Sequence, residues 1–402
     1  MLAPRCTLRL SRSTHPALRT IASRGMASTP STSPSGTDSV VCLPEDPHAP
    51  LPLPADATVF SMIQPTGTVH LGNYLGALRP WQSIQDRAAA VAGGPRVIYG
   101  IADLHALTVP KRGRAAAATL AAQRREAVAT LLACGIDPER ATVAFQSGVA
   151  GLHTELFWQL SCLAPMGYLN RMTQWKDKRG GDPARERLGL FAYPVLMAAD
   201  ILVYRATHVP VGDDQSQHLE LTRYLAERFN AWYDCDLFPL PQTLYCGGGH
   251  GKKVRSLTDP QRKMSKSSGD AMSLVYVTDS PEQIRAKVRK ARTDSISDSF
   301  YFDPEGRPGV SNLLDIVAGL QEVPMATVER DVAGLRDYGA FKGYVADVIV
   351  EALRPVRERY ARYSTDTQYL QSVVDQGNAA ATEIAAENMR RVRDVVGLTQ
   401  SM

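Results

Sequence analysis

A strand, a turn and a helix are predicted in succession by 57-ATVFSMIQPTGTVHLGNY-74. The continuous apolar run at 57–63 is typical of a buried strand, and the helix should begin near Asn73. Gly67 and Gly72 lie in the turn between them. This order of elements is the first half of a parallel βαβ unit.

The same alternation continues along the chain. Further strands are predicted at 96–103 and 141–147, with a helix at 114–134 between them. Strands separated by helices indicate an α/β fold with a doubly wound parallel sheet. Ligands of such sheets bind at the carboxyl ends of the strands. From about residue 281 the pattern becomes helical, and Pro355 should kink or split one of the helices.

The N-terminal segment explains the net charge of +4. Residues 1–37 contain five arginines and no acidic residue, so the rest of the chain has 40 basic and 41 acidic residues and a net charge of −1. A segment rich in Arg and Ser and lacking acids is typical of a mitochondrial transit peptide, although a disordered basic tail is the alternative. The overall charge is therefore no indication of nucleic-acid binding.

Composition excludes several classes of protein. No apolar run approaches about 18 residues, so a soluble chain is expected. The six cysteines form no C-x-x-C pair, and a disulfide framework belongs to small secreted chains. We therefore expect reduced cysteines and no resident metal. The positions are Cys6, Cys42, Cys134, Cys162, Cys235 and Cys246.

Two motifs suit nucleotide chemistry. The first, between the first strand and its helix, contains Gln64, Pro65, Thr66, His70, Gly72 and Asn73. Gly72 lets the backbone approach a ligand because it has no Cβ, and a helix N-terminus favours an anion. The second motif, Lys263-Met264-Ser265-Lys266-Ser267, offers ammonium groups and hydroxyls to a pyrophosphate leaving group. Either motif alone would also fit an ordinary turn or a solvated basic loop.

In this order the two motifs resemble the HIGH and KMSKS signatures of class I aminoacyl-tRNA synthetases. The first reads His70-Leu71-Gly72-Asn73, with Asn in place of the second histidine, and KMSKS is complete. The resemblance covers roughly residues 57–400. It implies a Rossmann-like catalytic domain followed by an all-α anticodon-binding domain. The expected division is a transit peptide at 1–37, a disordered linker at 38–56, the catalytic domain at 57–280 and the helical domain at 281–402.

Residues 191–204 and 209–223 narrow the resemblance to the tryptophan enzymes of the bacterial and mitochondrial type, with the tyrosine enzymes as nearest siblings. Indole offers one N–H donor and no acceptor. Asp200, next to Ala199 and Ile201, would supply one acceptor in an apolar slot. A buried carboxylate needs a partner or a function. The alternative is an Asp that caps a helix or forms a surface salt bridge.

The resemblance implies further roles for particular residues. The indole slot would be lined by Phe60, Met197, Val209 and Val211, and the other end of the tryptophan would be held by Tyr193 and Gln215. Besides the first motif, ATP would contact Gly212, Asp213, Asp214, Val254, Lys263, Met264, Ser265, Lys266 and Ser267. The catalytic residues would be Gln64, Lys176, Lys263 and Lys266.

Two departures and one charged stretch add to this interpretation. Met62 stands where the family commonly has glycine, which would narrow the pocket, and a Gly-rich insert occupies 246–251. Residues 251–292 carry eleven basic and four acidic residues, a local charge of +7 that would suit a phosphate backbone.

The implied function is ATP-dependent activation of tryptophan and its transfer to tRNA in the mitochondrial matrix. ATP would be a substrate that carries Mg²⁺ on its phosphates, and the family implies a homodimer. Three alternatives stay open at this point: a tyrosine enzyme, a small-metabolite nucleotidyltransferase with a similar turn, and an inactive RNA-binding paralogue.

Overall fold

The structure is a computed structural model that describes residues 40–44, 49, 51–109, 112–149, 151–179, 186–212, 215–245, 251 and 253–399. The predicted transit segment lies outside the described residues. Residues 37–402 form one compact unit.

A parallel sheet of six strands forms the centre of this unit, in the order β1-β6-β5-β2-β3-β4. Its strands are β1 Val40–Cys42, β2 Thr58–Ile63, β3 Arg96–Ile101, β4 Thr142–Phe145, β5 His208–Pro210 and β6 Gln242–Tyr245. From β2 the chain adds β3 and β4 on one side and then returns to add β5 and β6 on the other. This confirms the predicted doubly wound sheet, and its switch point lies between β2 and β5.

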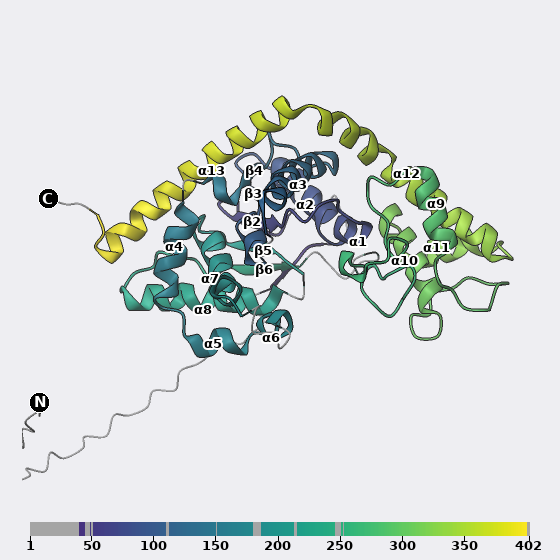
Figure 1. Cartoon of the computed structure of the whole chain (residues 1–402), viewed down its shortest axis with the longest axis horizontal. Helices are drawn as coiled ribbons and strands as arrows, with labels where there is room; N and C mark the ends of the chain where they lie inside the picture. The colour runs from purple at the N-terminus through teal and green to yellow at the C-terminus, as the bar shows by residue number, and fades with distance from the viewer. Residues whose placement is uncertain are drawn as a thin grey trace, which may run out of the picture. The chain divides into compact units, whose positions relative to one another are not determined.

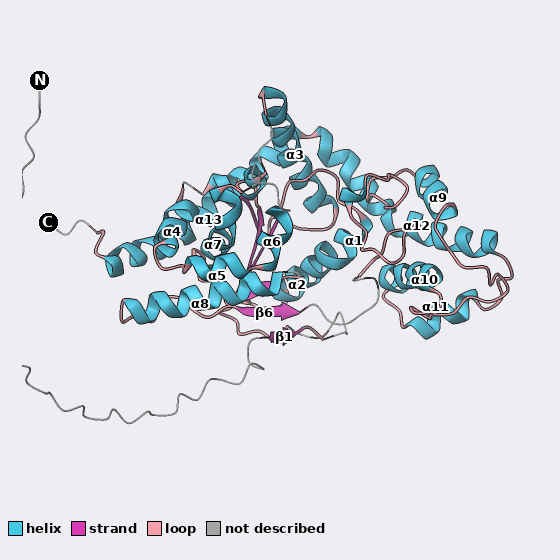
Figure 2. Cartoon of the chain, turned by 60° about the horizontal axis from the view of Figure 1, so that its bottom comes forward, coloured by secondary structure: helices cyan, strands magenta, loops and turns pink. Residues whose placement is uncertain are grey.

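One strand corrects the prediction of a disordered linker at 38–56. Val40–Cys42 pairs in parallel with β6, Val40 opposite Thr243 and Cys42 opposite Tyr245. Figure 2 shows β1 beside β6 at the edge of the sheet. Three residues are too few to show a strand pattern in a segment rich in Pro and Ser, because a typical strand has about five or six.

Helices follow the strands as the alternation predicts. The helix expected near Asn73 is continuous from Leu71 but changes its hydrogen bonding at Tyr74, where five residues form a π-helix. The helical elements up to the second motif are α1 Leu71–Asn73, η1 Tyr74–Leu78, α2 Arg79–Ala89, η2 His105–Thr108, α3 Arg114–Ala133, η3 Gln146–Gly148, α4 Leu152–Ser161, α5 Met166–Arg171, α6 Thr173–Arg179, α7 Leu188–Leu202, α8 Ser216–Trp232 and η6 Lys266–Ser268.

The C-terminal region is helical, as predicted, and consists of α9 Pro281–Arg289, α10 Pro308–Gln321, α11 Met325–Val332, α12 Tyr338–Thr365 and α13 Thr367–Val396. Pro355 lies inside α12 and does not split it. The Arg357 side chain donates to the carbonyl of Val350, one turn before the proline, at 2.9 Å. A side chain thus adds a hydrogen bond beside the part of the helix where proline removes one.

Two hydrophobic clusters fill the interior. The first lies around α2, α3 and the helices from α9 to α12, and the second around α4, α7 and α8. Helix α13 contributes to both: Leu370 and Val373 belong to the first cluster, and Ala381 and Met389 belong to the second. Figure 1 shows α13 passing beside β4 and α4, and contacts with both elements agree. The last helix therefore packs on the sheet-bearing part of the chain.

Among the described helices, none is long and apolar enough to cross a membrane. The described cysteines that carry a free thiol are Cys42, Cys134, Cys162 and Cys235.

The contact between α13 and β4 yields a stability prediction. A methyl group at Gly377 would overlap the carbonyl oxygen of Val143, so Gly377→Ala must push α13 away from the sheet. We expect a loss of about 3 kcal/mol in the free energy of unfolding, measured by urea denaturation. Gly343→Ala is the matched control, because Gly343 also lies within a long helix but has open space around it. That variant should gain up to about 1 kcal/mol. Equal stability of the two variants would contradict this packing.

Candidate active site

The first motif forms the turn at the carboxyl end of β2. His70 caps α1 there, and its Nδ1 accepts the backbone N–H of Asn73 at 3.3 Å. Burial, followed by the positive charges of Lys266 and Lys263, lowers the pKa of His70 to about 4. The ring is therefore neutral near pH 7, as its role as an acceptor requires.

The second motif meets the first across 200 positions of sequence. The Lys266 ammonium donates to the carbonyl of Gly67 at 3.0 Å and to the carbonyl of Thr66 at 3.3 Å. Burial lowers the pKa of Lys266, and the charge of Glu126 opposes this shift. The lysine thus lies over the turn where an anionic ligand would be bound.

Met264 and Gly72 bring the two motifs close together. Met264 is buried, and its N–H donates to the carbonyl of Val254, also buried, at 3.0 Å. A Cβ at Gly72 would lie 3.2 Å from the His70 ring and 3.6 Å from the Cβ of Met264. Gly72 therefore leaves room for the His70 ring and for Met264, while its approach to a ligand stays a prediction.

The other predicted ATP and catalytic residues that the structure describes differ in exposure. Gln64, Thr66, Asn73, Gly212 and Lys263 are exposed, Ser265 is half-buried, and Pro65 is buried. Lys176 lies on α6 with an exposed side chain. Asp213, Asp214 and the side chain of Ser267 lie outside the described part of the chain, as does most of the insert 246–251.

The residues predicted to line the indole slot come together in the second hydrophobic cluster. Phe60 and Val209 are buried members, and Met197 and Val211 are partly buried against them. Tyr193, predicted for the other end of the tryptophan, is buried in the same cluster. They arrive from β2, α7 and β5, and from the residue after β5. Gln215 is half-buried, and its backbone N–H donates to Gly212 at 2.9 Å.

Asp200 is 1% exposed on α7 and binds three side chains. Its Oδ1 accepts from Gln146 Nε2 and from His153 Nδ1, each at 2.7 Å. Its Oδ2 accepts from His105 Nε2 at 2.7 Å. Burial alone would raise the pKa of Asp200, but the hydrogen bonds from His105 and His153 outweigh it and lower the pKa to about 2. The group is therefore a buried, ionised carboxylate and neither a cap nor a surface salt bridge.

One of these partners, His153, is itself bound by the side chain of Tyr204. Tyr204 Oη lies 2.8 Å from His153 Nε2. Because Nδ1 of His153 carries the hydrogen given to Asp200, the hydroxyl donates to Nε2 when the imidazole is neutral. The Tyr204 ring also stacks on Phe60, with ring centroids 5.2 Å apart.

Sequence reasoning missed Gln146, His105, His153 and Tyr204. A signal existed for two of them, since His105 follows β3 and Gln146 follows β4 directly. Polar residues just after parallel strands lie at the ligand-binding edge of the sheet. His153 and Tyr204 lie on or next to helices, and nothing in their local pattern indicates their contacts.

Tyr193 also has partners that the sequence did not indicate. Its hydroxyl donates to Gln174 Oε1 at 2.9 Å and lies 3.0 Å from Nε2 of His218. Burial raises the pKa of Tyr193 to about 12, so the hydroxyl keeps its proton.

Met62 packs against the neighbouring strand. It lies opposite Gly100 on β3, and a Cβ at Gly100 would overlap the end of the Met62 side chain. The glycine thus makes room for the methionine. A large residue on β2 is matched by the absence of a side chain on β3.

The basic stretch 251–292 is only partly available to a polyanion. Lys287 is 7% exposed and binds Asp279, while Arg285 pairs with Asp347. Arg289 and Lys290 keep exposed side chains. The sequence count of charges therefore exceeds the number that the surface offers.

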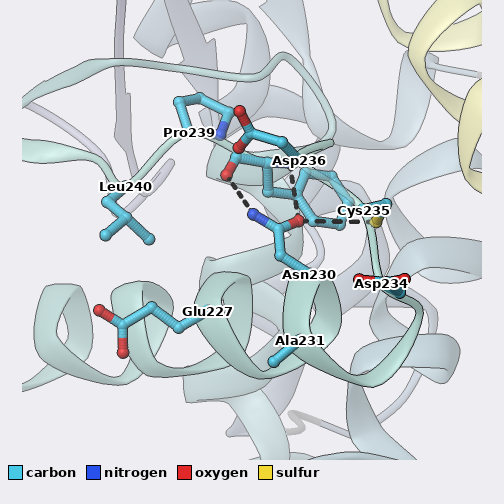
Figure 3. Close-up of a pocket in the computed structure, with 9 residues that line it drawn as sticks. Glu227, Asn230, Ala231, Asp234, Cys235, Asp236, Pro239 and Leu240 are labelled. Atoms are coloured by element: carbon cyan, nitrogen blue, oxygen red, sulfur yellow. Dashed lines mark hydrogen bonds between the residues drawn. The ribbon is translucent and has the colours of Figure 1, made fainter.

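A hollow of about 610 Å³ lies beyond α8 and contains none of the predicted site residues. Figure 3 shows Asn230 at its centre, donating to the carbonyl of Phe238. Asn230 Oδ1 also accepts the N–H groups of Leu237 and Phe238. These bonds anchor the loop after α8, so we regard the hollow as a structural feature of that loop.

Among the described residues, no group of three or more His, Cys, Asp or Glu could hold a metal ion.

Known proteins resemble this chain over most of its length. The mitochondrial tryptophan–tRNA ligase of Saccharomyces cerevisiae is 50% identical over 86% of this chain and 92% of its own length. Tryptophanyl-tRNA synthetase from Campylobacter jejuni, solved with ADP and tryptophan, has 30% identity and a TM-score of 0.70 over 85% of this chain and all of its own. The enzyme from Mycoplasma pneumoniae has 29% identity and a TM-score of 0.72 over 86% of this chain and 98% of its own.

A family model described as "tRNA synthetases class I (W and Y)" matches residues 54–354. The matched region includes both motifs, α7 with Asp200, the helices α9 to α11 and the first part of α12. The chain belongs to the class I tRNA synthetases of the tryptophan and tyrosine group.

Proposed function

We propose that this chain activates tryptophan with ATP and transfers the tryptophanyl group to tRNA. The observation that carries the choice of amino acid is the bonding of Asp200. A carboxylate has about four acceptor positions, and the described residues fill three of them, two on Oδ1 and one on Oδ2. One position on Oδ2 is left for a ligand donor, and indole supplies a single N–H donor.

The reaction would proceed in two steps. The tryptophan carboxylate attacks the α-phosphate of ATP, forming a mixed anhydride while the bond to pyrophosphate breaks. A hydroxyl of the terminal adenosine of tRNA then attacks the carbonyl carbon and releases AMP. Such transfers depend mainly on positioning and charge stabilisation. Lys263, Lys266, Lys176 and Gln64 are the proposed catalytic residues.

The contacts of Lys266 support its role in the first step. Its ammonium now binds two neutral carbonyl oxygens of the first motif. A phosphate oxygen is a stronger acceptor than a carbonyl, because a charged pair adds to the hydrogen bond. Lys266 would therefore exchange these carbonyls for the leaving pyrophosphate as its charge develops.

Magnesium would enter with ATP. The described residues contain no cluster that could hold a resident ion. Mg²⁺ is commonly bound through substrate phosphates and one or two carboxylates, which fits a nucleotide-borne ion.

The mitochondrial matrix is the proposed location. The Arg-rich, acid-free composition of 1–37 supports it, as does the similarity to a mitochondrial enzyme. The helical region from α9 onward is proposed to bind the anticodon part of tRNA. Exposed basic side chains of the stretch 251–292, such as Lys290, would face its phosphates.

Amino-acid-dependent exchange of pyrophosphate into ATP tests the proposed function. We expect exchange with tryptophan and at least about 10³-fold lower kcat/KM with tyrosine, because its single ring would not fill the indole slot and its hydroxyl oxygen, even when its O–H donates to Asp200, would be buried without a donor. A preference for tyrosine would select the sibling enzyme. If neither amino acid supported exchange, the chain would instead be interpreted as an inactive RNA-binding paralogue.

Lys266→Ala should separate binding from chemistry. We expect single-turnover formation of the adenylate to slow by about 10²-fold or more, with a smaller change in ATP affinity, because the lysine acts mainly on the transition state. Arg262→Ala is the matched control, since it removes a cation from the same loop whose partner is the exposed Asp259. An unchanged rate in Lys266→Ala would refute the role of this lysine.

A homodimer is proposed from the family, and two exposed side chains support it. Trp158 on α4 is 69% exposed and Met166 at the start of α5 is 68% exposed. Contiguous apolar patches mark interfaces, and a variant of Trp158 tests whether these two side chains belong to one. Sedimentation at assay concentration should give the mass of two chains, and Trp158→Glu should shift it toward one. A monomer in the unmodified protein would contradict the proposal.

A further inference from the structure

Helix α13 contacts the segments that hold Asp200, although it lies at the far end of the sequence. Figure 1 shows α13 beside β4 and, further toward its C-terminus, beside α4. Three of its polar side chains bind three segments of the pocket, and each of these segments carries a side chain of the Asp200 network.

The first bond involves Asn378. Its Oδ1 accepts the backbone N–H of Phe145, the last residue of β4, at 2.9 Å. The next residue is Gln146, which donates to Asp200 Oδ1. Because β4 is at the edge of the sheet, no further strand fixes this part of its backbone. Together with the pairing of Phe145 to Ile101 on β3, the asparagine therefore fixes where the Gln146 side chain begins.

The second bond involves Asn388, ten residues later and buried. Its Nδ2 donates to the carbonyl of Val203 at 3.0 Å. Val203 precedes Tyr204, whose hydroxyl binds His153, and His153 donates to the same Oδ1 of Asp200.

The third contact is an ion pair between Arg393 and Glu155. Nε and Nη2 of the arginine bind the two carboxylate oxygens at 2.7 and 2.5 Å. Glu155 lies on α4 two residues after His153, so the pair fixes the helix that carries this histidine. A bidentate pair restrains direction as well as distance.

Close packing makes these restraints stiff. Gly377 lies directly on the Val143 backbone, and a Cβ at Gly148 would overlap the Asn378 side chain. Ala381 and Ala385 are fully buried in the cluster that contains Phe60 and Val209. A densely packed interior transmits small displacements, since few voids can absorb them.

We propose that Asn378, Asn388 and Arg393 are positioning residues for recognition of the indole N–H, acting through Gln146, Tyr204 and His153 on the carboxylate of Asp200. The inference rests on the proposed function and assigns α13 to its amino-acid pocket. All three contacts act on residues that bind Oδ1, either directly through Gln146 and His153 or through Tyr204. His105, by contrast, donates to Oδ2. Their joint effect is to fix the orientation of the carboxylate, and with it the direction of its remaining acceptor position.

The test measures recognition of the N–H itself. Pyrophosphate exchange is run with tryptophan and with 3-benzothienylalanine, an isostere in which sulfur replaces the indole N–H. The ratio of the two kcat/KM values reports on the acceptor, while a loss of general stability would lower both values together. Asp200→Asn sets the scale, because it places an amide in the carboxylate site, and should reduce the ratio by about tenfold or more.

The variants are chosen in matched pairs. Asn378→Ala removes the acceptor for Phe145, whereas Asn378→Asp keeps an acceptor oxygen at the same place. Arg393→Ala breaks the pair with Glu155, whereas Arg390→Ala removes an arginine whose partners, Glu387 and Asp394, are on α13 itself. We expect Asn378→Ala and Arg393→Ala to reduce the ratio by about threefold or more, with the KM for ATP within about twofold of the unmodified protein.

The role of α13 and the proposed function would be contradicted by different results. Asn378→Asp and Arg390→Ala should keep the ratio of the unmodified protein. If Asn378→Ala fails to fold, Arg393→Ala carries the same test, because its ion pair is partly exposed. An unchanged ratio in the folded variants, or an equal loss with both amino acids, would overturn the role of α13. Absence of tryptophan-dependent exchange in the unmodified protein would instead overturn the proposed function.

Discussion

The buried charge of Asp200 is the constraint on which the amino-acid pocket depends. An ionised carboxylate that is 1% exposed is costly unless donors replace its water. Here Gln146, His105 and His153 supply them from three different segments. The ends of β3 and β4 and the helices α4 and α7 must therefore meet at one point. The depressed pKa indicates that these donors outweigh the cost of burial.

The charge beside the first motif is positive rather than negative. Lys263 and Lys266 contribute to the depressed pKa of His70, which reports a positive potential at the first motif. Lys266 satisfies its own donors on nearby carbonyls. The proposed site thus combines a negative group, suited to accept from an N–H, with a positive region suited to phosphates. Both lie at the carboxyl edge of the sheet, because the first motif follows β2 and two of the Asp200 partners follow β3 and β4.

Much of the architecture could be predicted because the signals are local. Apolar runs predicted β2, β3 and β4, and Gly135 and Pro138 predicted the end of α3, because each depends on a few neighbouring residues. The strand β1 could not be predicted, since three residues in a Pro-rich segment gain their structure only by pairing with β6. Asp200 was predictable from its apolar context, but His153 and Tyr204 were not, because their contacts span about fifty positions.

Helix α13 illustrates the general reason for that limit. As sequence it is an amphipathic helix, and its period predicts a helix on any apolar surface. Its polar residues Asn378 and Asn388 would ordinarily be assigned to the solvated face. The structure places them against backbone groups of β4 and of the residue after α7, where each satisfies one group. The identity of a residue at such a position is determined by an unpaired N–H or C=O on a distant element. A pattern within the helix carries no information about that group, so the functional meaning of these asparagines follows only from the fold.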